Sequence, residues 1–291
     1  MIRVHAKAIM VCGLLLAASA CLAQTAASRK PKLPPGVDPG GVAIGLITTG
    51  IDYTRPDVAR CLARDGEGEL IGRDVVDRDR LPYRQATGAV ADDVLFALIP
   101  CGRVRVVPVR VDPVDGLSLG RALAFLAQSP ARVVVLPVAS QPKDWAPFQA
   151  AAAQFKILLV IVAAGDEVRD LDKGALRFGG LSIENTSVVS AAVPEIDNRS
   201  GNRSGKLVMR GAIGATSVDM VVDIAAGGGG AGARRSPTSD AAVLSAVTLV
   251  CSDFAARVQP KLGVDLWALL GAMARPDDRL PDQVMLIPRC G

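Results

Sequence analysis

The chain has 291 residues, of which 50% are hydrophobic, 3% aromatic and 21% charged, and its formal net charge is +4. This length suits one large domain or two small ones, and the absence of an internal repeat favours one domain. A dispersed positive charge with so few aromatic residues argues against a nucleic-acid partner.

The first 23 residues have the features of a secretory signal. Two basic residues near the start precede an apolar run over 8–20, and small residues follow it. The run is too short to cross a bilayer, which takes about 20 residues, and no later stretch is long enough. We therefore predict cleavage after Ala23 and a secreted or periplasmic product without a membrane span. The alternative is a lipoprotein acylated at Cys21, although Ala18 stands where such signals usually carry leucine.

Residues 24–40 are polar and rich in proline and glycine, which indicates an extended leader. We place one domain at 41–275 and a C-terminal tail at 276–291. The strand candidates in the domain are short apolar runs: 42–48, 104–110, 132–138, 157–163, 187–193 and 219–225. The helix candidates are 55–64, 88–98, 117–128, 145–155, 239–254 and 264–274.

Most of the strand candidates are apolar throughout, without the alternation of a half-exposed strand. Such strands are covered on both faces, and here they alternate with helices. The pattern predicts an α/β fold with three layers, α/β/α, around a doubly wound, mostly parallel sheet. In such a sheet the ligand crevice lies beyond the carboxyl ends of the strands.

Four cysteines remain after the predicted cleavage site: Cys61, Cys101, Cys251 and Cys290. An even number in an oxidising compartment favours disulfides, and four cysteines allow three pairings. We favour Cys61–Cys101 and Cys251–Cys290, because each pair keeps to one end of the chain. Zinc fits less well, since there is no Cys-x-x-Cys spacing and no histidine after the signal, and we expect no metal or cofactor.

Two polar, glycine-containing segments invite a functional interpretation. The run Gly227–Gly230 resembles a phosphate-binding loop, but the lysine that contacts phosphate in such loops does not follow it, so a surface loop is favoured. Arg199, Arg203 and Lys206 stand among asparagine and serine and are typical of a solvated loop.

Four stretches stand out in chain order: GLITTGID at 45–52, the unit 104–138, LVIVAAGD at 159–166 and SPTSDAA at 236–242. In this order they resemble the subtilase family, the subtilisin-like serine peptidases, and the resemblance covers roughly 41–275. It implies a subtilisin-like fold. The four stretches are similar to the segments that bear the family's catalytic aspartate, its substrate-binding edge, its oxyanion asparagine and its nucleophilic serine.

The resemblance places Thr48 where the family has its catalytic aspartate, which orients and charges a histidine. Thr48 carries no charge. The histidine should begin the helix near 88–98, where Asp92 and Asp93 stand instead, and the only histidine of the chain, His5, lies in the predicted signal. Asp92 and Asp93 also have a structural interpretation as solvated or capping carboxylates.

The oxyanion position is occupied by Asp166, which when ionised would repel the negative charge that this position stabilises. Only Ser239 matches a catalytic residue, as the nucleophile. A serine at a helix N-terminus is also common as a cap. Losing the base of such a triad costs on the order of 10⁶ in turnover, and losing the oxyanion donor about 10²–10³.

The sequence therefore predicts an inactive homologue that binds a peptide or protein, with strand addition to an edge around 134–141 as the expected mode. The alternative is an acid-acting endopeptidase like the sedolisins, which pair a serine nucleophile with carboxylates and have an aspartate at the oxyanion position. Asp166 fits the sedolisins. However, the sedolisin helix that carries the base has a Glu with an Asp four residues later, and no such pair is present in this sequence. A third possibility is an exported fold that uses an unrelated surface.

Overall fold

The computed structural model describes residues 30–84, 92–137, 144–165, 183, 185–196, 203–210, 220–223, 236–251, 273–277 and 280–286. The chain divides into two compact units, Met1–Lys32 and Leu33–Gly291. Every element described below belongs to the second unit.

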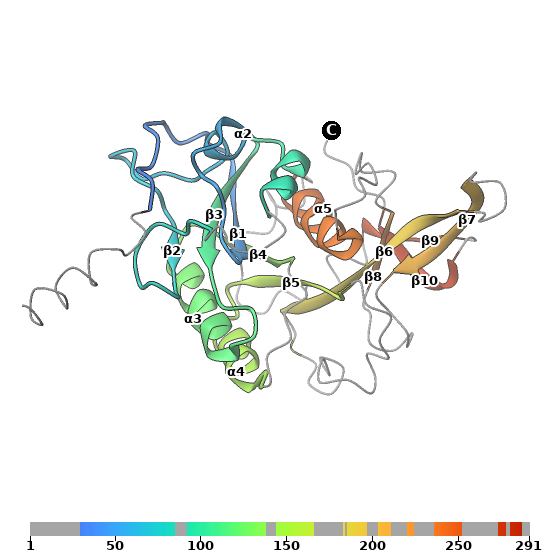
Figure 1. Ribbon diagram of the computed structural model, residues 1–291. Coiled ribbons are helices and arrows are strands. Elements are labelled where there is room, and N and C mark those ends of the chain that lie inside the picture. Colours follow the sequence, from blue (N-terminus) through green and yellow to red (C-terminus); the bar gives the residue numbers. More distant parts are fainter. Residues whose placement is uncertain are drawn as a thin grey trace, which may run out of the picture. The chain divides into compact units, whose positions relative to one another are not determined.

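Within the described residues, ten strands form one sheet in the order β2-β3-β1-β4-β5-β6-β8-β10-β9, with β7 paired to β6 (Figure 1). The strands are β1 Val42–Thr48, β2 Arg73–Asp74, β3 Val104–Arg110, β4 Val133–Leu136, β5 Leu159–Ala163, β6 Thr186–Ile196, β7 Arg203–Arg210, β8 Met220–Asp223, β9 Arg275–Asp277 and β10 Leu280–Leu286. All pairs from β2 to β10 along this order are parallel, and only β9 and β7 pair antiparallel. The predicted mostly parallel sheet is confirmed.

Helices cover both faces of this sheet. They are α2 Pro56–Ala59, the 3-10 helix η2 Asp92–Leu98, α3 Gly116–Ala127, α4 Ala146–Gln154 and α5 Pro237–Cys251. In β1, Ile44 and Leu46 join a core with α2, η2 and α5, whereas Ala43 and Ile47 join a second core with α3 and α4. This alternation follows from the two-residue period of a strand, and it gives the predicted three layers, with α3 and α4 on one side and α5 on the other in Figure 1.

The helix expected at 55–64 is shorter than its sequence pattern, because α2 ends at Ala59. The chain then turns towards the sheet, where Ala63 donates its backbone N–H to the Val106 carbonyl at 2.8 Å. Backbone pairing with β3 therefore overrides the helical pattern. The helix expected at 264–274 lies outside the described residues, apart from its last two positions.

Two segments expected to lie outside the sheet are part of it. Of the polar segment interpreted as a solvated loop, Arg203 and Lys206 belong to strand β7, which pairs antiparallel with β6, and Arg199 lies outside the described residues. The residues after 275, expected as a tail, form β10, which pairs parallel with β8. In both cases pairing with a neighbouring strand determines the conformation, although the local sequence lacks a continuous apolar run.

The residues at 33–40, expected as an extended leader, are held against the domain, and we call them the N-terminal strap. The Asp38 carboxylate accepts hydrogen bonds from the Arg64 backbone N–H at 2.7 Å and from Arg105 Nη1 at 2.8 Å. Buried Arg64 also donates from Nη2 to the Pro34 carbonyl at 3.0 Å. The strap is thus attached to the turn before β2 and to β3 by charge-assisted hydrogen bonds.

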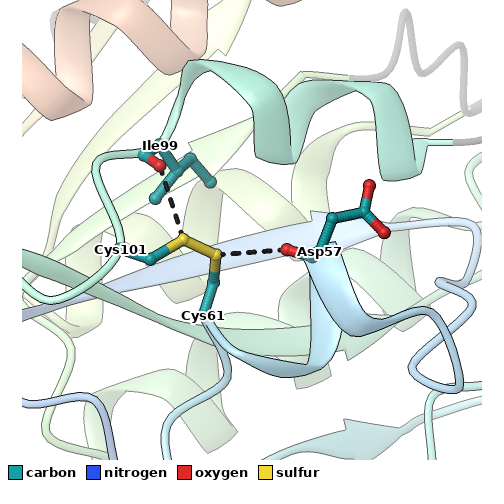
Figure 2. Close-up of a disulfide and its surroundings, with 4 residues drawn as sticks. All are labelled: Asp57, Cys61, Ile99 and Cys101. Atoms are coloured by element: carbon teal, nitrogen blue, oxygen red, sulfur yellow. Dashed lines mark hydrogen bonds between the residues drawn. A yellow bond between two sulfur atoms is a disulfide. The ribbon is translucent and has the colours of Figure 1, made fainter.

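The predicted disulfide between Cys61 and Cys101 is confirmed (Figure 2). It joins the turn after α2 to the residues that follow η2. Cys251 at the end of α5 is also disulfide-bonded, and its partner lies outside the described residues, so the Cys251–Cys290 pairing stays a prediction. Among the described helices, none combines the length and apolar character needed to cross a membrane.

Candidate functional site

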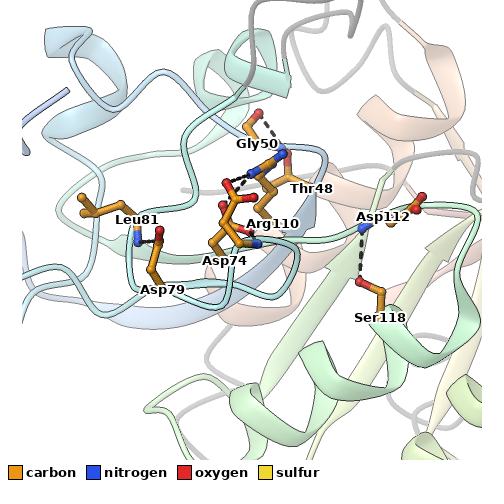
Figure 3. A network of polar contacts seen from close by, with 9 residues as sticks. Thr48, Gly50, Asp74, Asp79, Leu81, Arg110, Asp112 and Ser118 are labelled. Atoms are coloured by element: carbon orange, nitrogen blue, oxygen red, sulfur yellow. Dashed lines mark hydrogen bonds and ion pairs between the residues drawn. The ribbon is translucent and has the colours of Figure 1, made fainter. Parts of the chain in front are cut away.

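Strand β1 ends at Thr48, the residue that the sequence predicts at the position of a catalytic aspartate. Thr48 is completely buried. Its Oγ1 accepts a hydrogen bond from the Gly50 backbone N–H at 3.1 Å and donates to the Gly50 carbonyl at 3.3 Å (Figure 3). Gly50 has a φ of 125°, and an added Cβ would lie 2.6 Å from the Arg84 Cα, so this turn requires glycine. The Thr48 side chain is therefore part of a tight turn and brings no charge to the site.

A buried ion-pair cluster adjoins Thr48. Arg110, the last residue of β3, is the register partner of Thr48. Its Nη1 donates to Asp74 Oδ2 at 2.6 Å and to Asp77 Oδ2 at 2.7 Å. Asp74 is fully buried and Arg110 nearly so. We call these three residues the Arg110 cluster.

The two carboxylates of this cluster stabilise the charged form of Arg110. Burial by itself would lower the pKa of Arg110, but the hydrogen bonds and charges of Asp74 and Asp77 outweigh that effect and raise the pKa above its ordinary value. The guanidinium is therefore a fixed cation, and Asp74 is a carboxylate already engaged by it. A carboxylate that is already paired with a guanidinium is poorly suited to orient a catalytic base and stabilise its positive charge.

Ser239 is the third residue of α5, and its side chain is buried among hydrogen-bonding partners. Its Oγ donates to the Pro137 carbonyl and lies 2.7 Å from Ser236 Oγ, while its backbone N–H donates to Ser236 Oγ at 3.1 Å. Ser236 precedes the helix and satisfies this N–H, which is the work of an N-cap. The cap of α5 is therefore Ser236, and the interpretation of Ser239 as the cap is wrong.

Thr48 and Ser239 lie at the same edge and on the same face of the sheet. The β1–β4 register pairs Leu46 with Val135, so Thr48 and Pro137 follow two residues later on strands about 4.8 Å apart. Leu46 and Val135 belong to the core beneath α5, and side chains two residues apart in a strand share a face. Because Ser239 contacts the Pro137 carbonyl, its hydroxyl is one strand away from Thr48.

The remaining predicted site residues are described only in part. Asp92 and Asp93 begin η2, whose backbone packs against α5, but their side chains lie outside what the structure describes. Asp166 also lies outside it, directly after Gly165 and three residues beyond the end of β5. Within the described residues, no group of three or more His, Cys, Asp or Glu side chains is placed to hold a metal ion.

The structure corrects the expected peptide-binding edge around 134–141 for its first residues, Val134 and Val135. Val134 and Val135 pair with β1 on one side and with β5 on the other, so β4 is central in the sheet over these residues. A backbone that is paired on both sides has no free row of N–H and C=O groups for an added strand. For residues 138–141, which lie outside the described residues, the edge stays a prediction.

Sequence reasoning missed the Arg110 cluster and the role of Ser236. One signal for the cluster was available, because an arginine that ends an apolar strand needs a buried partner. Several acidic residues occur between 74 and 79, but nothing in the sequence says which of them turns towards β3.

Solved structures with a similar fold are subtilisin-like proteases. Subtilase cytotoxin SubAB has a TM-score of 0.59 at 12% identity, over 86% of this chain and 88% of that one. A cold adapted subtilisin-like serine proteinase has a TM-score of 0.52 at 17% identity, over 90% and 94%. A protease from Pseudoalteromonas arctica PAMC 21717 has a TM-score of 0.56 at 14% identity, over 87% of each chain.

At these identities the likeness establishes the fold, which is that of the subtilisin-like proteases. No protein-family model matches the chain, and no curated protein matches its sequence. The predicted fold class is thus confirmed, and the chemistry of the site has to be argued from its residues.

Proposed function

We propose that this chain is an exported subtilisin-like protein that has lost peptidase activity and acts by binding a peptide or protein partner. The observation that carries the proposal is the end of β1. Thr48, which the sequence resemblance compares with the catalytic aspartate, is uncharged and buried, and its hydroxyl is hydrogen-bonded to Gly50. Asp74 and Asp77 lie beside Arg110, the register partner of Thr48, and both carboxylates are engaged by that arginine.

The surroundings of Ser239 support the same conclusion. A serine nucleophile is activated when a base removes its proton. The Ser239 hydroxyl instead donates a hydrogen bond to the Pro137 backbone carbonyl, which is too weak a base to remove the proton. The chain contains one histidine, His5, in the predicted signal. Without base and oxyanion donor, the expected loss in turnover is on the order of 10⁶ or more.

Export is supported by the cysteine chemistry. Structural disulfides persist mainly in oxidising compartments, and both Cys61–Cys101 and the bond at Cys251 fit a secreted or periplasmic protein. Mass spectrometry of the natively exported chain tests the two processing alternatives. A first residue Gln24 supports signal cleavage after Ala23, whereas a lipid-modified Cys21 supports the lipoprotein.

The test of inactivity is labelling of the purified protein with a serine-directed fluorophosphonate between about pH 3 and about pH 8. Ser239→Ala is the matched control, and an active subtilisin is the positive control. We expect no Ser239-dependent labelling and an unchanged partner affinity in Ser239→Ala. Labelling of the wild type that disappears in Ser239→Ala would overturn the proposal.

A second candidate is an acid-acting endopeptidase like the sedolisins, favoured by Asp166 at the oxyanion position and by Asp92 and Asp93 at the start of η2. A protonated Asp166 could donate a hydrogen bond to an oxyanion below about pH 5. The decisive assay is peptide cleavage at about pH 3–5 by the wild type, Ser239→Ala and Asp166→Ala, with circular dichroism to verify folding. Cleavage lost in both variants establishes this candidate, and no cleavage in any protein excludes it.

A further inference from the structure

The hairpin of β6 and β7 extends the sheet beyond the carboxyl end of β5. Ala191 of β6 pairs with Arg210 of β7 and also with β8, so β7 and β8 lie on opposite sides of β6. Val189 pairs with Ala163 of β5 and also with β8, so β5 lies on the same side as β7. β7 therefore takes the place of β5 alongside β6 where β5 has ended (Figure 1).

This position brings the outer edge of β7 next to the candidate site. The neighbour of β5 on the side away from β6 is β4, which ends just before Pro137, the residue whose carbonyl binds Ser239. The side of β7 that faces away from β6 therefore lies beyond the carboxyl end of β5, on the side towards β4. Among the residues that the structure describes, β7 pairs only with β6.

The sequence of β7 is basic. It reads Arg-Ser-Gly-Lys-Leu-Val-Met-Arg from Arg203 to Arg210, with three basic residues and no acidic residue among eight. An edge strand offers a row of backbone N–H and C=O groups to an extended chain, and the charge of the strand selects which chains approach. Basic residues on an edge also serve to prevent pairing, so the two roles have to be separated by experiment.

We propose that the outer edge of β7 binds an extended acidic segment of a partner protein by strand addition. The proposal rests on the binding function proposed above and names the class of its partner. Val133 to Val135 of β4 are paired on both sides, whereas β7 has one edge without a described partner and a charge that complements acidic peptides. The added strand would run along β7 and would not need the Ser239 hydroxyl.

The probe is a short fluorescein-labelled peptide that alternates glutamate and valine, with binding to the full chain measured by fluorescence anisotropy. Two control peptides separate the sources of affinity. A lysine–valine peptide reverses the charge, and an N-methylated glutamate–valine peptide keeps the charge but cannot form the backbone hydrogen bonds of a strand. We expect the acidic peptide alone to bind, with an affinity that falls as salt is added.

The matched variants are Lys206→Glu with Arg210→Glu on β7, against Arg121→Glu on the exposed surface of α3. We expect the first pair to weaken binding at least about tenfold and the control to leave it unchanged. Backbone amide shifts in NMR spectra should locate the peptide at 203–210. Equal binding of the N-methylated peptide, or of the β7 variant, overturns the proposal.

These outcomes are distinguishable from failure of the proposed function. If the acidic peptide does not bind but the chain still lacks Ser239-dependent labelling and binds a partner elsewhere, only the β7 assignment is lost. If the peptide binds and is cleaved in a Ser239-dependent way, the proposed inactivity is lost while the binding surface stands.

Discussion

Removing Asp74 should destabilise this protein far more than removing an acidic residue from an exposed ion pair. Asp74 is fully buried and bonded to Arg110, whose side chain is only 8% exposed. Asp74→Ala leaves a buried guanidinium with Asp77 as its remaining carboxylate partner in the cluster. Breaking a buried pair in this way typically costs about 3–5 kcal/mol of the free energy of unfolding.

The matched control is Asp57→Ala in the pair between Arg55 and Asp57, whose side chains are 42% and 51% exposed. An exposed pair of this kind contributes about 0.2–1 kcal/mol, because solvent screens the charges and the side chains lose conformational freedom. A third variant, Arg110→Met with Asp74→Leu, removes both buried charges together. We expect it to be more stable than Asp74→Ala, because it leaves no buried charge without its buried partner.

Urea denaturation of the oxidised proteins, followed by circular dichroism, gives the free energies of unfolding for comparison. The expected order of stability is wild type and Asp57→Ala together, then the double variant, then Asp74→Ala. A loss in Asp74→Ala no larger than in Asp57→Ala would refute the assignment of the Arg110 cluster as a buried, mutually stabilising group. It would also remove the argument that the Asp74 carboxylate is already engaged by Arg110 and is therefore not available for catalysis.

Three further predictions concern stability. Burial alone would raise the pKa of Asp38, but hydrogen bonds from Arg64 and Gly40 and the charge of Arg105 outweigh it and lower the pKa. The contribution of Asp38 to the free energy of unfolding is therefore present above about pH 4 and is lost as the pH falls through the lowered pKa. Thermal unfolding should show this loss of stability at acid pH in the wild type and not in Asp38→Asn. Replacing both cysteines of the Cys61–Cys101 disulfide, which are 40 residues apart, should cost about 4 kcal/mol in the chain-entropy model, measured by urea denaturation with the Cys251 bond intact. Ser236→Ala should lower the free energy of unfolding by about 1 kcal/mol, because α5 loses its N-cap. Glycine is usually tolerated at an N-cap, so an equal loss in Ser236→Gly would argue against this role of Ser236.

The strands were the most predictable part of the fold. β1 and β3 coincide with the predicted runs 42–48 and 104–110, because a strand buried on both faces needs apolar residues throughout. Strand β7 was missed for the opposite reason. Its polar and basic sequence has no strand signal of its own, and its conformation depends on pairing with β6, which local sequence does not encode.

The site was predictable only where it depends on position along the chain. Thr48 ends a predicted strand and Ser239 begins a predicted helix, and the structure places both at one sheet edge. The contacts that decide their chemistry join distant segments: Ser239 with Pro137, 102 residues away, and Arg110 with Asp74, 36 residues away. Such pairs depend on how loops turn after the strands, and no sequence period reports that.

Helix α5 has a consequence for the order in which the chain folds. Its residues from Thr238 to Val250 are all buried, and they complete the core on one face of β1, β3, β4 and β5. The opposite face is covered by α3 and α4, which arise from the same stretch of chain as those strands. During synthesis or translocation, the first half of the domain therefore forms one finished face and one apolar face that α2 and η2 cover only in part, until residues beyond 236 emerge. We expect a chain truncated before Ser236 to bind hydrophobic dyes and to be degraded rapidly by added protease, unlike the full chain.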